Sequence, residues 1–368
     1  MIFQNLEPPT KVHPFNVSKC LRTSHLAKNP KTRILCSLKR SIQLALSLLA
    51  NGAKGSTLDE FLKFLEVEDR NHLNSVASDF VNKLSGSSTE GGPALSLVSG
   101  VWVDNSLPLN PTFVTVAESV YRGKAEVVDF QNKVKAEEVL DKVNKWEDSS
   151  NRIVLANALY FKGKWAREFV KSSTKNLTNH KNQFVRTFDC FKVLMLPYKK
   201  SVDENAASLS MYIILPEEID GLLPLTEMVC SDPLFFKKYV HDPYPKRVTM
   251  GRFWVPKFKI EHGFEAKKIL QDAGLKLPFS AQAEYDDLLL NPGESLTVSK
   301  VVHKSYIKVD EEGTEAAAVT CISAVFACAS VPPPPVNFVA DHPFMFVARD
   351  DTSGMVLFMG HVVNPLLE

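Results

Sequence analysis

The side chains that most often carry chemistry occur in this chain, but no local motif groups them. Its six cysteines stand at positions 20, 36, 190, 230, 321 and 328, without a C-x-x-C pair or the spacing of a zinc site. Serine, histidine and aspartate are present, but not within a G-x-S-x-G, P-loop, G-x-G-x-x-G or H-E-x-x-H motif. We therefore expect a protein that is not an enzyme and that uses no metal and no cofactor.

Four side chains remain as candidates for reactivity. Cys321 and Cys328 lie in an uncharged stretch, where exposure would make a thiol sensitive to oxidation, but no basic side chain stands nearby to activate it. His342 and His361 lie in apolar, strand-like segments near the C-terminus. We expect these histidines to fill core positions and the thiols to be reduced, so none of the four is predicted to be catalytic.

The most informative stretch of the chain is a segment whose backbone could add a strand to a β-sheet. Residues 309–337 read VDEEGTEAAAVTCISAVFACASVPPPPVN, and residues 316–331 contain neither charge nor proline. Every backbone N–H of that run can therefore enter a sheet ladder. Chains normally break such segments with charges, because an exposed one pairs with any open sheet edge. We infer that this segment functions by forming a new strand in a sheet. The alternative is that it is an ordinary strand followed by a proline-rich connection.

Side-chain alternation indicates which face of this segment would be buried. If Glu315 faces water, the residues that point the other way are all small or apolar. They are Thr314, Ala316, Ala318, Thr320, Ile322 and Ala324. Gly313 supplies a hinge before them, and the prolines at 332–335 stop the ladder after them.

Hydrophobic periodicity predicts the elements that would position this segment. Helices are expected at 41–50, at 57–65, from Pro111 onward and around 136–146. Strands are expected at 95–103, 125–130, 153–162, 193–198, 209–215, 248–260 and 298–310, with a C-terminal hairpin of 338–349 and 355–363. The stretch 153–162 is long and its centre is apolar on both faces, which is typical of a central strand. Because helices come early and strands late, the fold class is α+β.

Length and composition limit the other possibilities. The 368 residues contain no linker or repeat, so we expect one domain over 1–368, with an atypical segment at 1–34. Since 43 basic residues balance 42 acidic ones, we expect no nucleic-acid partner and no membrane partner. The N-terminus lacks the apolar stretch of a signal peptide. A cytoplasmic location follows as an expectation.

Several long motifs resemble those of the serpin family, and in detail those of plant serpins. VDEEGTEAAA at 309–318 resembles the hinge of the serpin reactive-centre loop, and residues 338–365 resemble the C-terminal signature. NALYFKGKW at 157–165, WVPKFKIEHGFEA at 254–266 and GGPALSLVSGVWVDNSL at 91–107 are further similarities. The resemblance covers about residues 35–368. It implies a serpin fold, in which N-terminal helices surround a large central mixed sheet with further sheets and an exposed reactive-centre loop at 313–337.

The resemblance implies a protease inhibitor that acts as a suicide substrate, as a monomer. Counting from Glu311 in the family's frame places the cleaved bond between Ala327 and Cys328, and a one-residue shift would make Phe326 the primary residue. Ala327 favours an elastase-like target, Phe326 a chymotrypsin-like one or, as the second residue, a papain-like cysteine protease. Some plant serpins occur outside the cell without a signal, so an extracellular location stays open.

The same resemblance assigns roles to the residues around the loop. The hinge that enters the sheet would be Gly313, Thr314, Glu315, Ala316, Ala317 and Ala318. Glu311 and Lys257 match an ion pair at the top of the sheet, beside Trp165. Asn157 and His303 match residues that bond across the sheet strands.

Three departures from the family leave a second function open. Leu38, Lys39 and Arg40 stand where the family has a Phe-Ser-Pro-x-Ser entry into a helix. Only residues 147–152 link the expected helix and the strand at 153, and 171–188 lacks elements of the family's third sheet. The permissive hinge favours an inhibitor, whereas these departures favour a non-inhibitory serpin-fold protein that is cleaved as a substrate or only binds.

Overall fold

A computed structural model describes residues 33–34, 37–86, 93–130, 153–167, 169, 176–178, 182–200, 207–242, 244–291, 293, 296–311 and 334–364. The helices are α2 (Ser37–Ala50), α3 (Gly55–Leu65), α4 (Arg70–Gly86), α5 (Pro111–Ser119), α7 (Leu222–Ser231) and α8 (Lys267–Asp272), with a π-helical turn η2 (Phe236–Val240) and a 3₁₀ turn η3 (Leu277–Phe279). Within these ranges no helix is both long and apolar enough to cross a membrane.

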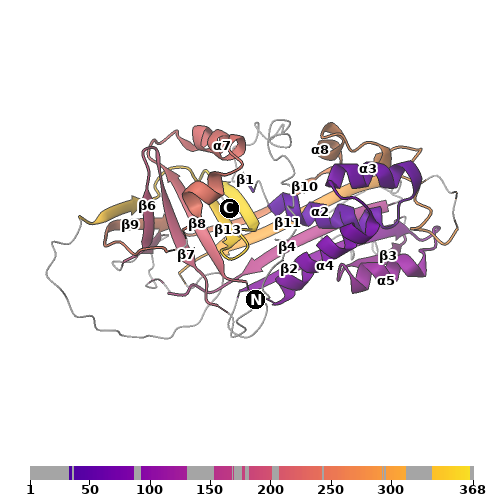
Figure 1. The fold of residues 1–368 in the computed structure, drawn as a ribbon, viewed down its shortest axis with the longest axis horizontal. Coiled ribbons are helices and arrows are strands. Elements are labelled where there is room, and N and C mark those ends of the chain that lie inside the picture. Colours follow the sequence, from indigo (N-terminus) through magenta and orange to yellow (C-terminus); the bar gives the residue numbers. More distant parts are fainter. Residues whose placement is uncertain are drawn as a thin grey trace, which may run out of the picture.

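The strands fall into three sheets (Figure 1). The central sheet has the order β10 (Phe258–Glu265), β11 (Val298–Val309), β4 (Ile153–Lys162), β2 (Ala94–Asp104) and β3 (Lys124–Val128). A second has the order β1 (Arg33–Ile34), β14 (Val356–Val362), β13 (Phe344–Asp350), β8 (Leu209–Pro216), β7 (Phe191–Pro197) and β6 (Phe184–Thr187). The third has the order β12 (Val336–Val339), β9 (Met250–Pro256) and β5 (Asn176–Thr178).

The central sheet is mixed, with one parallel pair in its middle and another, β2 with β3, at its edge. Strands β10 and β11 are antiparallel, β11 and β4 are parallel, and β4 and β2 are antiparallel. Strand β4 lies at the centre because most of its side chains are apolar on both faces, and seven of its ten residues are buried. The sequence prediction of a central strand at 153–162 is confirmed.

The early helices cover one face of the central sheet (Figure 1). Helix α2 is buried from Leu44 to Ala50 and packs against helices α3 and α4 and strands β2 and β4, with Leu48 and Leu49 fully buried. Helix α5 begins where expected, because Asn110 accepts a hydrogen bond from the N–H of Thr112 and Pro111 fixes the first turn. The same face of the sheet continues against the six-stranded and three-stranded sheets, because Leu159 and Phe161 in that second core alternate in phase with Ile153 and Leu155 beneath the helices.

Two predicted strands are wrong because each is divided between sheets. The expected strand at 248–260 breaks at Lys257, with β9 in the three-stranded sheet and β10 in the central one. Pro256, which ends β9, carries no N–H to continue the ladder. The expected strand at 338–349 likewise divides into β12 and β13 around Pro343. The segment 171–188 contributes β5 and β6, while the helix expected around 136–146 lies outside the described residues.

Candidate functional site

The candidate site is the boundary between strands β4 and β11, which we call the seam. The two strands are parallel and in register, with His303 opposite Asn157. Parallel pairs are slightly less stable per residue than antiparallel ones. Strand β11 ends at Val309, two residues before Glu311, so the strand-forming segment found in the sequence begins directly at one end of the seam.

Three buried polar side chains form a cluster at the middle of the seam, and one of their two contacts crosses it. The Asn157 Nδ2 group donates to Ser99 Oγ at 2.7 Å, and Asn157 Oδ1 lies 3.1 Å from His303 Nδ1. These residues come from β4, β2 and β11 respectively, and each exposes at most 2% of its surface. In such a dry place polar groups must be paired. The Asn157–His303 contact must therefore break whenever β4 and β11 separate.

Removing Ser99 should test this cluster. The variant Ser99→Ala leaves one buried Asn157 N–H without its acceptor, so we expect the free energy of unfolding to fall by about 1–3 kcal/mol. Chemical denaturation measures this loss. Ser119→Ala on the exposed end of α5 removes a hydroxyl that bonds only to the Thr115 carbonyl and should change stability by less than about 0.5 kcal/mol. Equal losses in the two variants would contradict the special role of the cluster.

An ion pair closes the end of the seam from which the loop segment leaves. Lys257 Nζ lies 2.7 Å from Glu311 Oε1, with side-chain exposures of 26% and 14%. Lys257 is the single residue between β9 and β10. The pair therefore joins the point where the chain changes sheets to the last described residue before the loop segment.

Trp165, in the segment that follows β4, binds the residues that follow β11 at the same end of the seam. Its side chain is 1% exposed, and its Nε1–H donates to the Asp310 carbonyl at 2.9 Å. The indole stacks on Tyr198 with a centroid distance of 4.5 Å, and the backbone N–H of Phe169 donates to the Glu311 carbonyl at 2.9 Å. The segment that follows β4 is thus fastened to both residues that follow β11.

The structure brings the predicted site residues together in two groups. Glu311, Lys257 and Trp165 meet at the end of the seam, and Asn157 and His303 meet in its middle. The hinge residues Gly313, Thr314, Glu315, Ala316, Ala317 and Ala318 and the reactive pair Ala327 and Cys328 lie outside the described residues. Their roles stay predictions, as do the roles of the two groups in loop movement.

Several members of these groups were missed from the sequence. Ser99, Phe169 and Tyr198 belong to them, together with the Asp310 carbonyl. Ser99 stands opposite Asn157 in the pairing of β2 with β4, so only knowledge of that register could have found it. In the part of the chain that the structure describes, no cluster of His, Cys, Asp and Glu could hold a metal ion.

Comparison with known proteins gives the class to which this fold and site belong. The family model for serpins (serine protease inhibitor) matches residues 21–365, so the chain belongs to the serpin family. The match extends N-terminally beyond residue 35, where the resemblance noted in the sequence began. The fold is accordingly the predicted serpin fold of the α+β class.

The similar proteins include plant serpins. Serpin-ZXA of Oryza sativa subsp. japonica is 41% identical over 362 residues, which cover 89% of each chain, and Serpin-ZX of Hordeum vulgare is 41% identical over 364 residues with the same coverage. The native stressed conformation of Arabidopsis AtSerpin1 is 34% identical, covers 96% of both chains and gives a TM-score of 0.78. Members of this family are protease inhibitors and not enzymes, and their partners are proteases.

Proposed function

We propose that this serpin inhibits its target protease as a suicide substrate, with the loop segment entering the seam as a new strand after cleavage. The observation that carries the proposal is the position of the seam. The central sheet has a parallel pair in its middle, and the chain leaves β11 directly into a segment with small residues at alternate positions. Insertion of a loop into a sheet is a known form of strand addition.

The topology favours entry at the seam over either neighbouring boundary. A chain that turns back after β11 runs antiparallel to β11 and, because β4 is parallel to β11, antiparallel to β4 as well. Insertion would therefore replace one parallel boundary by two antiparallel ones, which are the more stable kind per residue. On its other side β11 already has an antiparallel partner, β10.

The length of the segment also matches the seam. Fourteen residues run from Thr314 to Ala327, and strand β11 has 12 residues. At about 3.3 Å per residue, a fourteen-residue strand spans about 46 Å and reaches the far end of the sheet. A protease attached to Ala327 would be carried over that distance, away from the end at which it first bound.

The attachment follows from the chemistry of serine and cysteine proteases. The protease nucleophile attacks the Ala327 carbonyl, an acyl bond forms to the protease, and the peptide bond to Cys328 breaks with protonation of the new amine. Insertion that outpaces hydrolysis of the acyl bond traps the complex. Ala327 suits an elastase-like protease, and Phe326 before it suits a papain-like or, with a one-residue shift, a chymotrypsin-like enzyme.

A denaturing gel after incubation with protease tests the proposal. We would mix the protein with an elastase-like serine protease, a chymotrypsin-like one and a papain-like cysteine protease in separate reactions. The expected result is a band that survives SDS at the sum of the two masses, in a complex of one inhibitor with one protease. Sequencing the released fragment should give Cys328 as its new N-terminus.

The controls separate trapping from simple cleavage. Protease inactivated at its nucleophile should give no stable band, because no acyl bond can form. Cleavage near Ala327 by all active proteases without a stable band would contradict the proposal. It would assign the protein to the non-inhibitory alternative, a serpin by fold that is only a substrate.

A further inference from the structure

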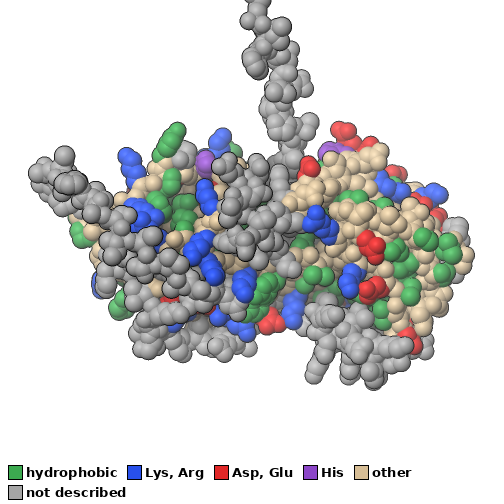
Figure 2. Space-filling view, turned by 90° about the horizontal axis from the view of Figure 1, so that it is seen from below, with side chains coloured by type: hydrophobic (Ala, Val, Ile, Leu, Met, Phe, Trp, Pro, Cys, Tyr) green, Lys and Arg blue, Asp and Glu red, His purple; other side chains and the backbone are tan. Residues whose placement is uncertain are grey.

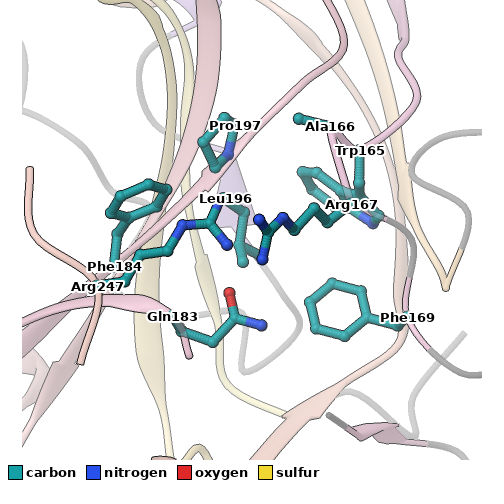
Figure 3. A pocket seen from close by; sticks show the side chains of 9 residues that line it. All are labelled: Trp165, Ala166, Arg167, Phe169, Gln183, Phe184, Leu196, Pro197 and Arg247. Carbon is teal, nitrogen blue, oxygen red and sulfur yellow. The ribbon is translucent and has the colours of Figure 1, made fainter. Parts of the chain in front are cut away.

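A small pocket lies beside the end of the seam, and two arginines face each other across it (Figure 3). Its walls include Trp165 and Phe169 from the segment after β4, Gln183 and Phe184 around the start of β6, and Leu196 and Pro197 from β7. Arg167 and Arg247 complete the lining, and in Figure 3 their guanidinium groups lie close together above the side-chain amide of Gln183.

Fixed backbone holds each arginine in place. Arg247 precedes Val248, whose N–H and carbonyl both bond to the backbone of Gln183, at 2.8 and 3.1 Å. Its guanidinium also lies 4.4 Å from the centre of the Phe184 ring. Arg167 follows Ala166, whose N–H donates to the Pro197 carbonyl at 2.8 Å. The two charges thus come from separate segments whose backbones are hydrogen-bonded beside the pocket.

The two positive charges have no acidic counterpart in the described residues. There, no carboxylate lies within 4.0 Å of either guanidinium, and two carboxylates of this region are paired elsewhere, Asp242 with Arg186 and Glu311 with Lys257. Burial, together with the charge of Arg167, lowers the pKa of Arg247. Like charges held side by side raise the energy of the site unless an anion shares them.

The surroundings and the size of the pocket define what could bind. In Figure 2, lysine and arginine side chains gather over the half of the molecule that holds the six-stranded and three-stranded sheets. The inner volume of the pocket is ≈ 20 Å³, little more than the roughly 10–15 Å³ that one water molecule requires. An organic ligand does not fit, whereas a single oxyanion group at the mouth can accept hydrogen bonds from both guanidinium groups.

We propose that Arg167, Arg247 and Gln183 form a binding site for one small oxyanion of the phosphate or sulfate type. The site adjoins the end of the seam, because its walls Trp165 and Phe169 bond to the backbone of Asp310 and Glu311. A bound anion stabilises the arrangement in which these two residues are fastened. None of the three residues belongs to the predicted reactive segment at 313–337, so the proposal does not depend on protease inhibition.

Titration with inorganic phosphate and with sulfate tests the site in the full-length protein, without protease. Isothermal calorimetry should show one saturable site for each anion at constant ionic strength set with sodium chloride. Occupied sites should also raise the thermal midpoint in proportion to the logarithm of the anion concentration above saturation. We expect Arg167→Gln and Arg247→Gln each to weaken binding by at least tenfold, because each removes one charged donor.

Arg252→Gln is the matched control. Arg252 is exposed on β9 and does not line the pocket, so this variant removes the same charge from the same region and should bind as the original protein does. Equal weakening in all three variants would show only a general charge effect and would overturn the proposal. So would the absence of saturable binding to the original protein. Arg167 is exposed, so its variant keeps the test valid if Arg247→Gln fails to fold.

Discussion

Replacing Ala316 by arginine should convert this serpin from an inhibitor into a substrate, whereas arginine at Ala317 should leave inhibition intact. The two residues are neighbours in the hinge, and side-chain alternation places Ala316 on the face that turns inward on insertion and Ala317 on the other. A charge carried into the sheet without a partner costs several kcal/mol. Since 1.36 kcal/mol changes a rate tenfold, insertion slowed in this way loses the competition with hydrolysis.

The measurement is the fraction of reacted inhibitor found in the SDS-stable band. We expect Ala316→Arg to lower that fraction at least tenfold while cleavage by the same protease continues at its original rate. The matched variant Ala317→Arg introduces the same side chain one residue later and should keep the original fraction. Equal loss in both variants would show that bulk or charge in the loop matters but alternation does not. That result would contradict insertion as a regular strand.

The sequence predicted local elements well where their periodicity was undisturbed. The pattern predicted strand β4 at its observed bounds because the centre of this stretch is apolar on both faces, and the start of helix α5 followed from Pro111. Helix α4 was missed, although Leu73, Ala77 and Val81 belong to a set of apolar residues that recur at the spacing of an amphipathic helix. Lys257 lies within one apolar pattern but between two sheets. Alternation alone does not show such a change of sheet.

The groups at the seam could not be derived from local pattern. Asn157 and His303 are 146 residues apart, and Lys257 and Glu311 are 54 apart. Only the register of β4 with β11, and the change of sheet at Lys257, brings these side chains together. Resemblance to the family supplied the pairs, whereas Ser99 needed the register of β2 as well. The pair of arginines at the pocket follows no motif, because the two residues come from two segments far apart in the sequence.

The second large effect is expected at Trp165. Replacing it with alanine should lower the free energy of unfolding by about 3–5 kcal/mol, because a fully packed aromatic side chain is removed. Replacing it with phenylalanine keeps a ring against Tyr198 but removes the donor to the Asp310 carbonyl. We expect that variant to lose about 1–2 kcal/mol, mostly the hydrogen bond. Denaturant unfolding with an unchanged m-value measures both losses.

Trp254→Ala is the control that shows whether the loss of stability comes from the position of Trp165 or from the removal of any tryptophan. Trp254 lies on β9 with 51% of its surface exposed, so the same replacement should cost less than about 1 kcal/mol there. The three variants also test whether Trp165 fastens the end of the seam or only fills space. If it fastens the seam, the phenylalanine variant should show faster hydrogen exchange at Asp310 and Glu311 than the original protein, although its core remains filled. Unchanged exchange in that variant would leave Trp165 a packing residue, with the Lys257–Glu311 pair and the Phe169 backbone bond closing the seam.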